Sequence, residues 1–477
     1  MKRLVIWMML FLTACSQVTP TPAAVQVNGR AEASRPNQAG LGDPFYPLLG
    51  NGGYDVRHYD LILSVDPEVN AVTGTTTIMA VASDTLSEFD LDFSGLEIDG
   101  VMVNGEVAEF SRRQMELVVR PGQPVAAGTD FITVVTYHGY PQAIGDDAIH
   151  RLSGWQKMPG GIFVASEPSG AMTWFPCNNH WSDKASFSFY VTVPDGYQVV
   201  ANGRPISTST AGGLSTQIWD EPNPMSTYLA MLVIGRYEQS AQEAASGVKM
   251  LNYFPVGTSA QVRDDFDQTP EMLDFFANLI GPYPFDTYGT VLVNQPLGFA
   301  METQTRSLFG SEGGSEETVA HELAHQWFGN SLTPATWRDV WLKEGFATYL
   351  SYLWIGESQG REAFEKEIQA VYDKAVMTQY GVFFEPIGTL RPETAPELYG
   401  AATYYRGAMT LHALRLKVGD EVFNKILREF YARFAGKTAT TFDFVETAQA
   451  VSGLVLKDFF TLWLDTLWMP AKPGLSQ

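Results

Sequence analysis

The sequence predicts an α+β multidomain protein in which an all-β domain precedes a mainly helical domain with a small sheet. Two observations lead to this prediction. Between residues 46 and 245, short runs of β-branched and aromatic residues alternate with turn dipeptides, whereas from 246 to 470 apolar residues recur at helical spacing. At 477 residues the chain is long enough for two or three domains, and 45% hydrophobic with 18% charged residues is an ordinary globular balance.

The chain begins with a segment typical of exported bacterial proteins. In residues 1–14, Lys2 and Arg3 precede an apolar run that is too short for a bilayer-spanning helix, which needs about 20 residues. The run ends in Leu12-Thr13-Ala14-Cys15, which resembles a bacterial lipobox, the sequence that directs lipid attachment to the cysteine and cleavage just before it. We expect a mature chain that begins at a lipidated Cys15. The alternative is a cleaved signal peptide whose cysteine is incidental.

Residues 15–45 are predicted to form a disordered tether. They are rich in Pro, Ala, Ser, Gly and Asn and lack hydrophobic periodicity. As a flexible coil, about 28 residues reach roughly 30 Å, enough to hold a folded enzyme off a membrane surface. The expected location is therefore the bacterial cell envelope, outside the cytoplasm, with a lipid anchor in the membrane.

Charge and cysteine content narrow the range of partners. The formal net charge of −22 argues against nucleic acid and against anionic lipid headgroups, since both are polyanions, although solubility is the simpler reason for such a charge. The chain has only one cysteine besides Cys15, Cys177. If Cys15 carries lipid, Cys177 has no second thiol with which to form an intramolecular disulfide. The stability of the folded protein must then come from packing.

The domain from 46 to 245 is predicted to consist of strands joined by tight turns. Alternating segments indicate strands at 59–65, 75–81, 131–136 and 187–193. Turn signals are Asp99-Gly100, Asn104-Gly105, Asp195-Gly196 and Asn202-Gly203.

The domain from 246 to 470 is predicted to be mainly helical, with residues 471–477 as a tail. One strand-like run, 288–293, indicates a small sheet beside the helices. The expected helices are 264–279, 315–328, 340–353, 361–380, 404–416, 421–434 and 442–451.

The most informative motif is His321-Glu322-Leu323-Ala324-His325, followed downstream by Glu344. On a helix, residues i and i+4 share a face, so His321 and His325 can present two imidazoles to one tetrahedral metal. With Glu344 as third ligand the fourth position stays open for water, which is the catalytic arrangement of zinc. Glu322 lies beside the metal and can take the proton of that water. The motif predicts one Zn²⁺ per chain and hydrolytic chemistry.

The alternative is that two histidines fall at helical spacing by chance. With 7 His in 477 residues, a match over five positions together with a distant carboxylate makes this the weaker interpretation. The flanking residues support a helix, because Ser315 is a suitable N-cap, acidic residues follow it, and Gly329 supplies a stop.

Several motifs together resemble the aminopeptidase N family of zinc metallopeptidases, the gluzincins, over roughly residues 50–470. The run from His321 to Asn330 is highly specific for this family, and Trp341-Leu342-Lys343-Glu344-Gly345-Phe346-Ala347 resembles its third-ligand segment. Lys343 stands where an Asn is usual, a change that does not touch a ligand. The resemblance implies a thermolysin-like catalytic domain at 246–470 and hydrolysis of peptide bonds with release of the amino-terminal residue.

The resemblance also implies a subsite for the substrate's free amino terminus. Phe299-Ala300-Met301-Glu302-Thr303 is similar to the family's Gly-Ala-Met-Glu-Asn segment, which makes Glu302 the amine-binding residue and places Ala300 and Met301 in the substrate-binding strand. Phe299 and Thr303 depart from the family pattern. Glu167 lies in a segment that resembles the contribution of the amino-terminal domain, and it would share the ammonium with Glu302. Peptides with a free amino terminus are therefore the expected partners.

A further match assigns the oxyanion donor. Tyr404-Tyr405-Arg406-Gly407-Ala408 is like the family segment in which the Tyr three residues before the Gly stabilises the tetrahedral intermediate. This selects Tyr404. Tyr399 is a weaker candidate for the same pocket.

Two other functions stay open at this point. One is a zinc endopeptidase in which Glu302 no longer binds the amine, and the other is a non-catalytic, zinc-stabilised binding lipoprotein on the cell surface. The resemblance ends near Met469, so the large carboxy-terminal helical domain common in the family is expected to be missing, which would leave the cleft more open on that side.

Overall fold

The computed structural model describes residues 40–379 and 387–473. The predicted signal peptide, Cys15 and most of the tether lie outside the described residues. The predicted tether includes residues 40–45, yet this stretch already belongs to the folded part. Asp43 is only 5% exposed, and it accepts the backbone N–H groups of Phe45 at 2.8 Å and Trp337 at 3.4 Å.

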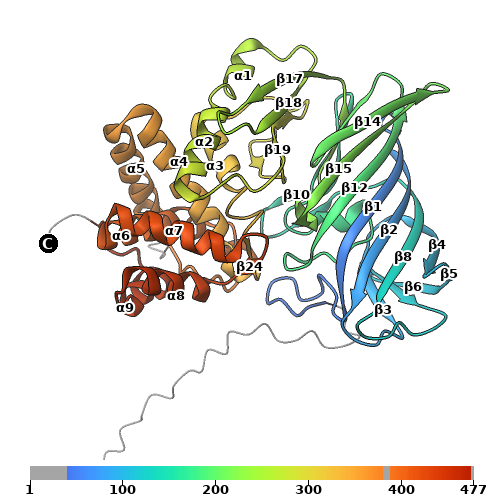
Figure 1. Ribbon diagram of the computed structural model, residues 1–477, viewed down its shortest axis with the longest axis horizontal. Coiled ribbons are helices and arrows are strands. Elements are labelled where there is room, and N and C mark those ends of the chain that lie inside the picture. Colours follow the sequence, from blue (N-terminus) through green and yellow to red (C-terminus); the bar gives the residue numbers. More distant parts are fainter. Residues whose placement is uncertain (1–39, 380–386, 474–477) are drawn as a thin grey trace, which may run out of the picture. The chain divides into compact units, whose positions relative to one another are not determined.

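The first domain is built on a large, mainly antiparallel sheet (Figure 1). Within the described residues it has eight strands in the order β14-β15-β12-β1-β2-β8-β4-β5, and only β1 and β12 pair in parallel. The bounds in that order are Arg204–Ala211, Leu214–Ser226, Lys184–Pro194, Tyr54–Asp66, Ala71–Ala82, Asp130–Gly139, Glu97–Val103 and Glu106–Val107.

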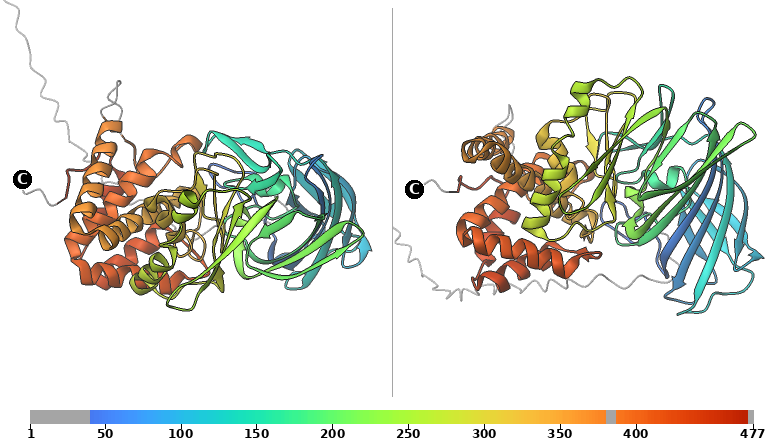
Figure 2. Two further views of the ribbon diagram at one scale, coloured as in Figure 1. Left: turned by 90° about the horizontal axis from the view of Figure 1, so that it is seen from above. Right: turned by 45° about the horizontal axis from the view of Figure 1, so that its top comes forward.

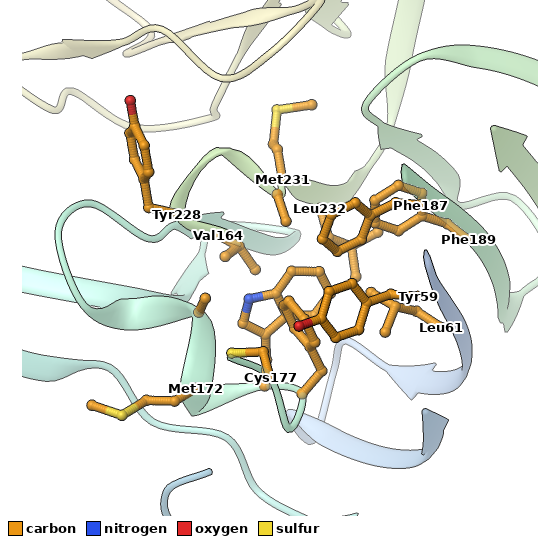
Figure 3. Packing of buried hydrophobic residues seen from close by; sticks show 14 of the residues in the cluster. Tyr59, Leu61, Val164, Met172, Cys177, Phe187, Phe189, Tyr228, Met231 and Leu232 are labelled. Atoms are coloured by element: carbon orange, nitrogen blue, oxygen red, sulfur yellow. The ribbon is translucent and has the colours of Figure 1, made fainter. Parts of the chain in front are cut away.

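The alternation of side chains along these strands explains why they pack on one face. In β12 every second residue is buried, among them Phe187 and Phe189, while the intervening residues are partly exposed. Because side chains of a strand alternate between faces, such a sequence buries one face only. Figure 3 shows Phe187 and Phe189 packed with Tyr59 and Leu61 near Cys177. The strands of this sheet confirm the predicted all-β domain.

Smaller sheets complete this domain and carry loops toward the site described below. A five-stranded sheet has the order β13-β16-β11-β10-β9, and a three-stranded sheet has the order β3-β7-β6. The bounds are Gln198–Ala201, Leu232–Gly235, Gly161–Ala165, Arg151–Met158 and Ile144–Asp146 for the first, and Phe89–Asp92, Glu116–Arg120 and Glu109–Arg113 for the second. Short 3₁₀ turns follow at η1 (Gly170–Thr173) and η2 (Thr227–Leu229).

A mixed sheet opens the second domain, with the order β17-β18-β20-β22-β21 and β19 beside β18. The predicted strand 288–293 appears as β19 (Thr287–Tyr288) and β20 (Thr290–Leu292), and the other bounds are Tyr237–Glu243 for β17, Lys249–Pro255 for β18, Ser307–Phe309 for β22 and Ala300–Met301 for β21. Among the described strands, β21 pairs only with β22, so it forms the edge of this sheet.

The helices follow the predicted order. They are α1 (Ala260–Asp264), α2 (Thr269–Ile280), α3 (Glu316–Ala324), α4 (Trp341–Gln359), α5 (Arg361–Gln379), α6 (Gly407–Val418), α7 (Asp420–Phe434), α8 (Thr441–Ser452) and α9 (Lys457–Phe460). Short elements join them: β23 (Thr333–Pro334), η3 (Trp337–Asp339), η4 (Ala395–Glu397), η5 (Ala402–Arg406), β24 (Thr438–Ala439) and η6 (Thr461–Asp465). Helices α4 to α8, orange to red, lie next to one another in Figure 1 and in both views of Figure 2. Among the described residues, none of the helices has the length and apolar character needed to cross a bilayer.

The predicted helix 264–279 starts later than expected, at Thr269 as α2, and the short helix α1 that precedes it overlaps the predicted range only at Asp264. Pro270 lies in the first turn of α2. Because proline has no backbone N–H and clashes with the preceding turn, it is tolerated at a helix start but not in the interior. The chain therefore begins a new helix at Thr269.

Two buried carboxyl groups of the β domain, those of Asp92 and Glu116, lie close together and share one hydrogen-bond donor. Asn51 Nδ2 donates to Asp92 Oδ2 and Glu116 Oε2, both at 3.3 Å, while Asp92 also accepts the backbone N–H of Asn179 at 2.8 Å. Glu116 is 5% exposed. Burial and the neighbouring Asp92 raise the pKa of Glu116 to about 9.

This pKa predicts a pH-dependent stability. A carboxyl whose pKa is higher in the folded than in the unfolded state binds its proton more tightly when folded, so the free energy of unfolding falls as pH rises from about 5 to 9. Burial also raises the pKa of the adjacent Asp92, so the two carboxyl groups share this effect, which should be on the order of 1 kcal/mol per pKa unit. Glu116→Gln mimics the protonated form, and urea unfolding at pH 6 and pH 9 should show a smaller difference for the variant. If the difference in unfolding free energy between pH 6 and pH 9 were the same for wild type and variant, the raised pKa of Glu116 would be contradicted.

Candidate metal and peptide site

Helix α3 presents the metal-binding motif. Ser315 caps it, since its Oγ accepts the backbone N–H of Thr318 at 3.1 Å. Val319, Ala320, Leu323 and Ala324 are buried and fix one face of the helix against the core. His325 Nδ1 lies 3.1 Å from the carbonyl oxygen of Phe328. Because a neutral imidazole that donates from Nδ1 keeps Nε2 as an acceptor, this contact leaves His325 Nε2 for a metal.

The three predicted ligands converge. The Nε2 atoms of His321 and His325 are 3.0 Å apart, and each lies 3.4 Å from Oε2 of Glu344 on α4. Tetrahedral zinc with bonds of about 2.0–2.1 Å requires ligand atoms about 3.3–3.4 Å apart. The donor set and its spacing therefore fit a zinc ion, and these three residues would hold it.

Glu322 has the properties expected of a general base. It is 6% exposed, and its Oε2 atom has no hydrogen-bond partner among the described residues. One ligand atom each of Glu322, Glu302 and His325 lie within 4.8 Å of one another. Burial raises the pKa of Glu322 to about 8, although His325 lowers it in part. A divalent cation beside it would lower this pKa and favour the ionised form.

A cavity of about 510 Å³ opens at the metal site. Its wall includes every residue predicted for catalysis, metal binding or amine binding, together with Ala300 and Tyr399. Met301 differs, because its side chain is 3% exposed and belongs to the hydrophobic core. Met301 can therefore contribute to a substrate site only through its backbone.

The segment predicted to bind the substrate amine is held by residues that follow the histidines. Asn330 Nδ2 donates to the carbonyl oxygen of Glu302 at 2.7 Å, and Gln326 Nε2 donates to it at 3.2 Å. The Thr303 hydroxyl donates to the backbone carbonyl of Arg306, so this residue shapes the turn after β21. The Phe299 ring lies 3.8 Å below the guanidinium of Arg151, and both residues line the cavity.

The β domain contributes Glu167, which the sequence predicted from the resemblance of its segment to the family. It lies between β11 and η1, and its Oε1 accepts a hydrogen bond from the Tyr399 hydroxyl at 2.9 Å. Burial and the neighbouring Glu302 raise the pKa of Glu167 to about 7, against the effect of Lys343. Tyr228 donates to Glu302 Oε1 at 3.3 Å. The structure thus brings Glu167 and Glu302 to one wall of the cavity.

The prediction that Lys343 does not touch a metal ligand is wrong. The exchange of Asn for Lys was expected not to touch a ligand, but Nζ of Lys343 lies 3.1 Å from Oε1 of Glu344. It also donates to Glu302 and Glu167. Burial acts to raise the pKa of Glu344, but Lys343 and His325 together hold it well below its usual range. The departure from the family pattern was the only signal in the sequence that could have drawn attention to this residue.

Tyr404 is positioned by a close contact between two helices. The ideal Cβ position at Gly345, next to Glu344, is 2.8 Å from Cα of Gly407, so α4 and α6 can approach only with glycine at both positions. This contact brings the wider turn η5 to the zinc ligands, where the Tyr404 ring stacks on His321 with centroids 6.3 Å apart. Burial, Glu344 and Glu167 raise the pKa of Tyr404 well above its usual value. Its hydroxyl therefore stays protonated and can donate.

Comparison with known proteins agrees with this geometry. Residues 265–463 match the peptidase family M1 domain, and residues 56–229 match the peptidase M1 N-terminal domain. The M1 zinc metallopeptidase of Deinococcus radiodurans, as a mutant bound to the substrate Tyr-Ser-Ala, has 31% identity and a TM-score of 0.85. The match covers 91% of this chain and 99% of that one.

Two longer aminopeptidases are also similar. Aminopeptidase M1-B of Oryza sativa subsp. japonica is 26% identical over 85% of this chain and 49% of its own length. Endoplasmic reticulum aminopeptidase 1 of Homo sapiens is 25% identical over 83% of this chain and 45% of its own length. The chain thus spans about half the length of these relatives.

Proposed function

Since this chain belongs to peptidase family M1, we propose that it is a zinc-dependent aminopeptidase that hydrolyses the first peptide bond of its substrates. The observation that carries the proposal is the convergence of His321, His325 and Glu344 beside Glu322, whose Oε2 has no partner among the described residues. A structural zinc site has no use for such a carboxylate. The presence of Glu322 at this position therefore argues against a binding protein without catalysis.

Glu322 performs the proton transfers in this proposal. When bound, zinc would act as a Lewis acid that polarises the scissile carbonyl and makes water more acidic. Glu322 takes the proton from the attacking water and returns it to the leaving amine. The ionised carboxylate that a neighbouring cation favours accepts the proton in the first step, and the protonated carboxyl group donates it in the second.

Tyr404 stabilises the oxyanion that forms on the scissile carbonyl. Its phenol donates one hydrogen bond without adding charge, and its high pKa keeps that proton in place. The ring stack with His321 places it next to the metal ligands.

Glu302 and Glu167 set the register of the substrate. A peptide amine has a pKa of about 7.7–8.0, so near neutral pH it is largely protonated and attracted to carboxylates. Because β21 is a sheet edge, an extended peptide can pair with it while its amino end reaches Glu302. An endopeptidase is the alternative, and the products of an unblocked peptide decide between them.

We further propose that the protein is exported and anchored in the bacterial cell envelope through lipid on Cys15. The support is the sequence at residues 1–14 and its lipobox-like end.

Two variants separate catalysis from metal binding. Glu322→Gln should lower kcat by at least about 10²-fold, since general base catalysis contributes that much, while retaining one zinc per chain. Glu344→Gln should lose zinc as well as activity. Metal analysis after dialysis and mass spectrometry of the products check both, with release of the first residue expected from wild type. Undiminished turnover in Glu322→Gln, or cleavage at internal bonds only, would contradict the proposal.

Tyr404 and its neighbour Tyr405 form a matched pair for testing the oxyanion donor. Both line the cavity. Tyr404→Phe should lower kcat by about 10²-fold or more, with little change in KM, because the hydrogen bond forms mainly in the transition state. Tyr405→Phe should stay near wild type. A larger loss in Tyr405→Phe would transfer the role to that residue.

The lipid anchor predicts where the protein is found after cell fractionation. The wild-type chain should sediment with membranes, and Cys15→Ser should move it to the soluble fraction, because acyl chains supply the anchoring. Mass spectrometry of the amino-terminal peptide identifies the modification. An unmodified Cys15 in the mature chain would refute this proposal.

A further inference from the structure

A buried lysine occupies the centre of the carboxylate cluster. The Lys343 side chain is 0% exposed, and its Nζ donates to Oε1 of both Glu302 and Glu167. Nζ also lies 3.1 Å from Oε1 of Glu344. A lysine ammonium has three N–H donors. These three carboxylate oxygens, which come from three separate segments of the chain, match all of them.

The surroundings hold this ammonium on the protein side of the cluster. Nζ lies 5.2 Å from the ring centroid of Tyr228 and 5.9 Å from that of Trp181, distances at which aromatic rings attract a cation. Lys343 is not among the residues that line the cavity, whereas its carboxylate partners are. It therefore contacts them from the interior, while they face the space that a substrate would enter.

An internal ammonium changes what these carboxylates offer to a substrate. The α-ammonium of a peptide also carries one positive charge and three N–H donors, so it requires the same acceptors as Lys343. When Glu302 and Glu167 are both ionised, the ammonium of Lys343 reduces their net charge from −2 to −1. A substrate amine would bind the remaining oxygens beside a fixed positive charge, which repels it.

We propose that Lys343 is the specificity-determining residue of the amine subsite, and that it weakens selection for a free amino terminus by occupying Glu302 and Glu167 from within. The inference rests on the proposed peptidase function and extends its substrate class to peptides whose amino terminus is acylated. Hydrolysis of such a peptide adds water across the first peptide bond, releases the acylated first residue as a carboxylic acid and leaves a new free amine on the remainder.

The test uses one peptide with either a free or an acetylated amino terminus. The readout is the ratio of kcat/KM for the free form to kcat/KM for the acetylated form. Lys343→Asn removes the charge and should raise this ratio at least about tenfold, because removing a like charge favours only the protonated amine. Lys343→Arg keeps a cation and should leave the ratio near that of wild type. An unchanged or lower ratio in Lys343→Asn overturns the inference, since a purely structural role would slow both peptides equally.

A charge-balanced pair covers the case in which Lys343→Asn does not fold. Glu167→Gln alone is compared with Glu167→Gln combined with Lys343→Asn, which removes one cation and one anion. The ratio should rise from the single to the double variant. No rise overturns the inference.

Binding separates this inference from the function on which it rests. If neither peptide is hydrolysed by wild type, the proposed function fails, and calorimetry in the Glu322→Gln background then tests Lys343 alone. Adding Lys343→Asn should tighten binding of the free peptide at least about tenfold and leave the acetylated peptide unchanged. Equal affinities before and after the substitution contradict the role of Lys343 whatever the activity.

Discussion

The site depends on the requirement that buried charges be paired. Glu302 and Glu344 are almost fully buried, and Glu167 joins them at the same wall. Carboxylates this close repel one another and are poorly solvated, so they persist together only with cations or donors between them. Lys343 supplies one cation, and the zinc for which the histidines and Glu344 are suited would supply another. The surrounding elements hold these groups in place.

Hydrogen bonds to a backbone carbonyl and one close helix contact connect those elements. Asn330 and Gln326, which follow the histidines in the chain, donate to the carbonyl oxygen of Glu302. One hydrogen-bond network therefore connects the segment after α3 with the residue that follows β21. The contact between Gly345 and Gly407 holds α4 and α6 close to each other. A shift of either helix would move the predicted zinc ligand Glu344 and the proposed oxyanion donor Tyr404 together.

The proposed amine subsite combines features that favour and features that oppose the binding of a substrate ammonium. Tyr228 and Tyr399 donate to the same carboxylate oxygens that Lys343 engages, which orients both carboxylates but satisfies them in part. The cavity therefore offers a weaker negative charge than its acidic residues suggest. Enzyme specificity is a difference between affinities, so a fixed internal cation can reduce selectivity without removing any residue that contacts the substrate.

Local patterns in the sequence were enough to predict much of the secondary structure and the residues suited to bind zinc. Alternation predicted the β domain, helical periodicity predicted most helices, and the five-residue motif with Glu344 predicted the zinc ligands, because each depends on residues near one another in the chain. The late start of α2, with Pro270 in its first turn, was readable from proline chemistry but was missed. The family resemblance already predicted that Glu167 and Glu302 share one subsite, but only the tertiary structure showed that Lys343 lies between them. These contacts join segments 41 to 176 residues apart, and no local pattern fixes the distance between side chains that meet only when domains pack.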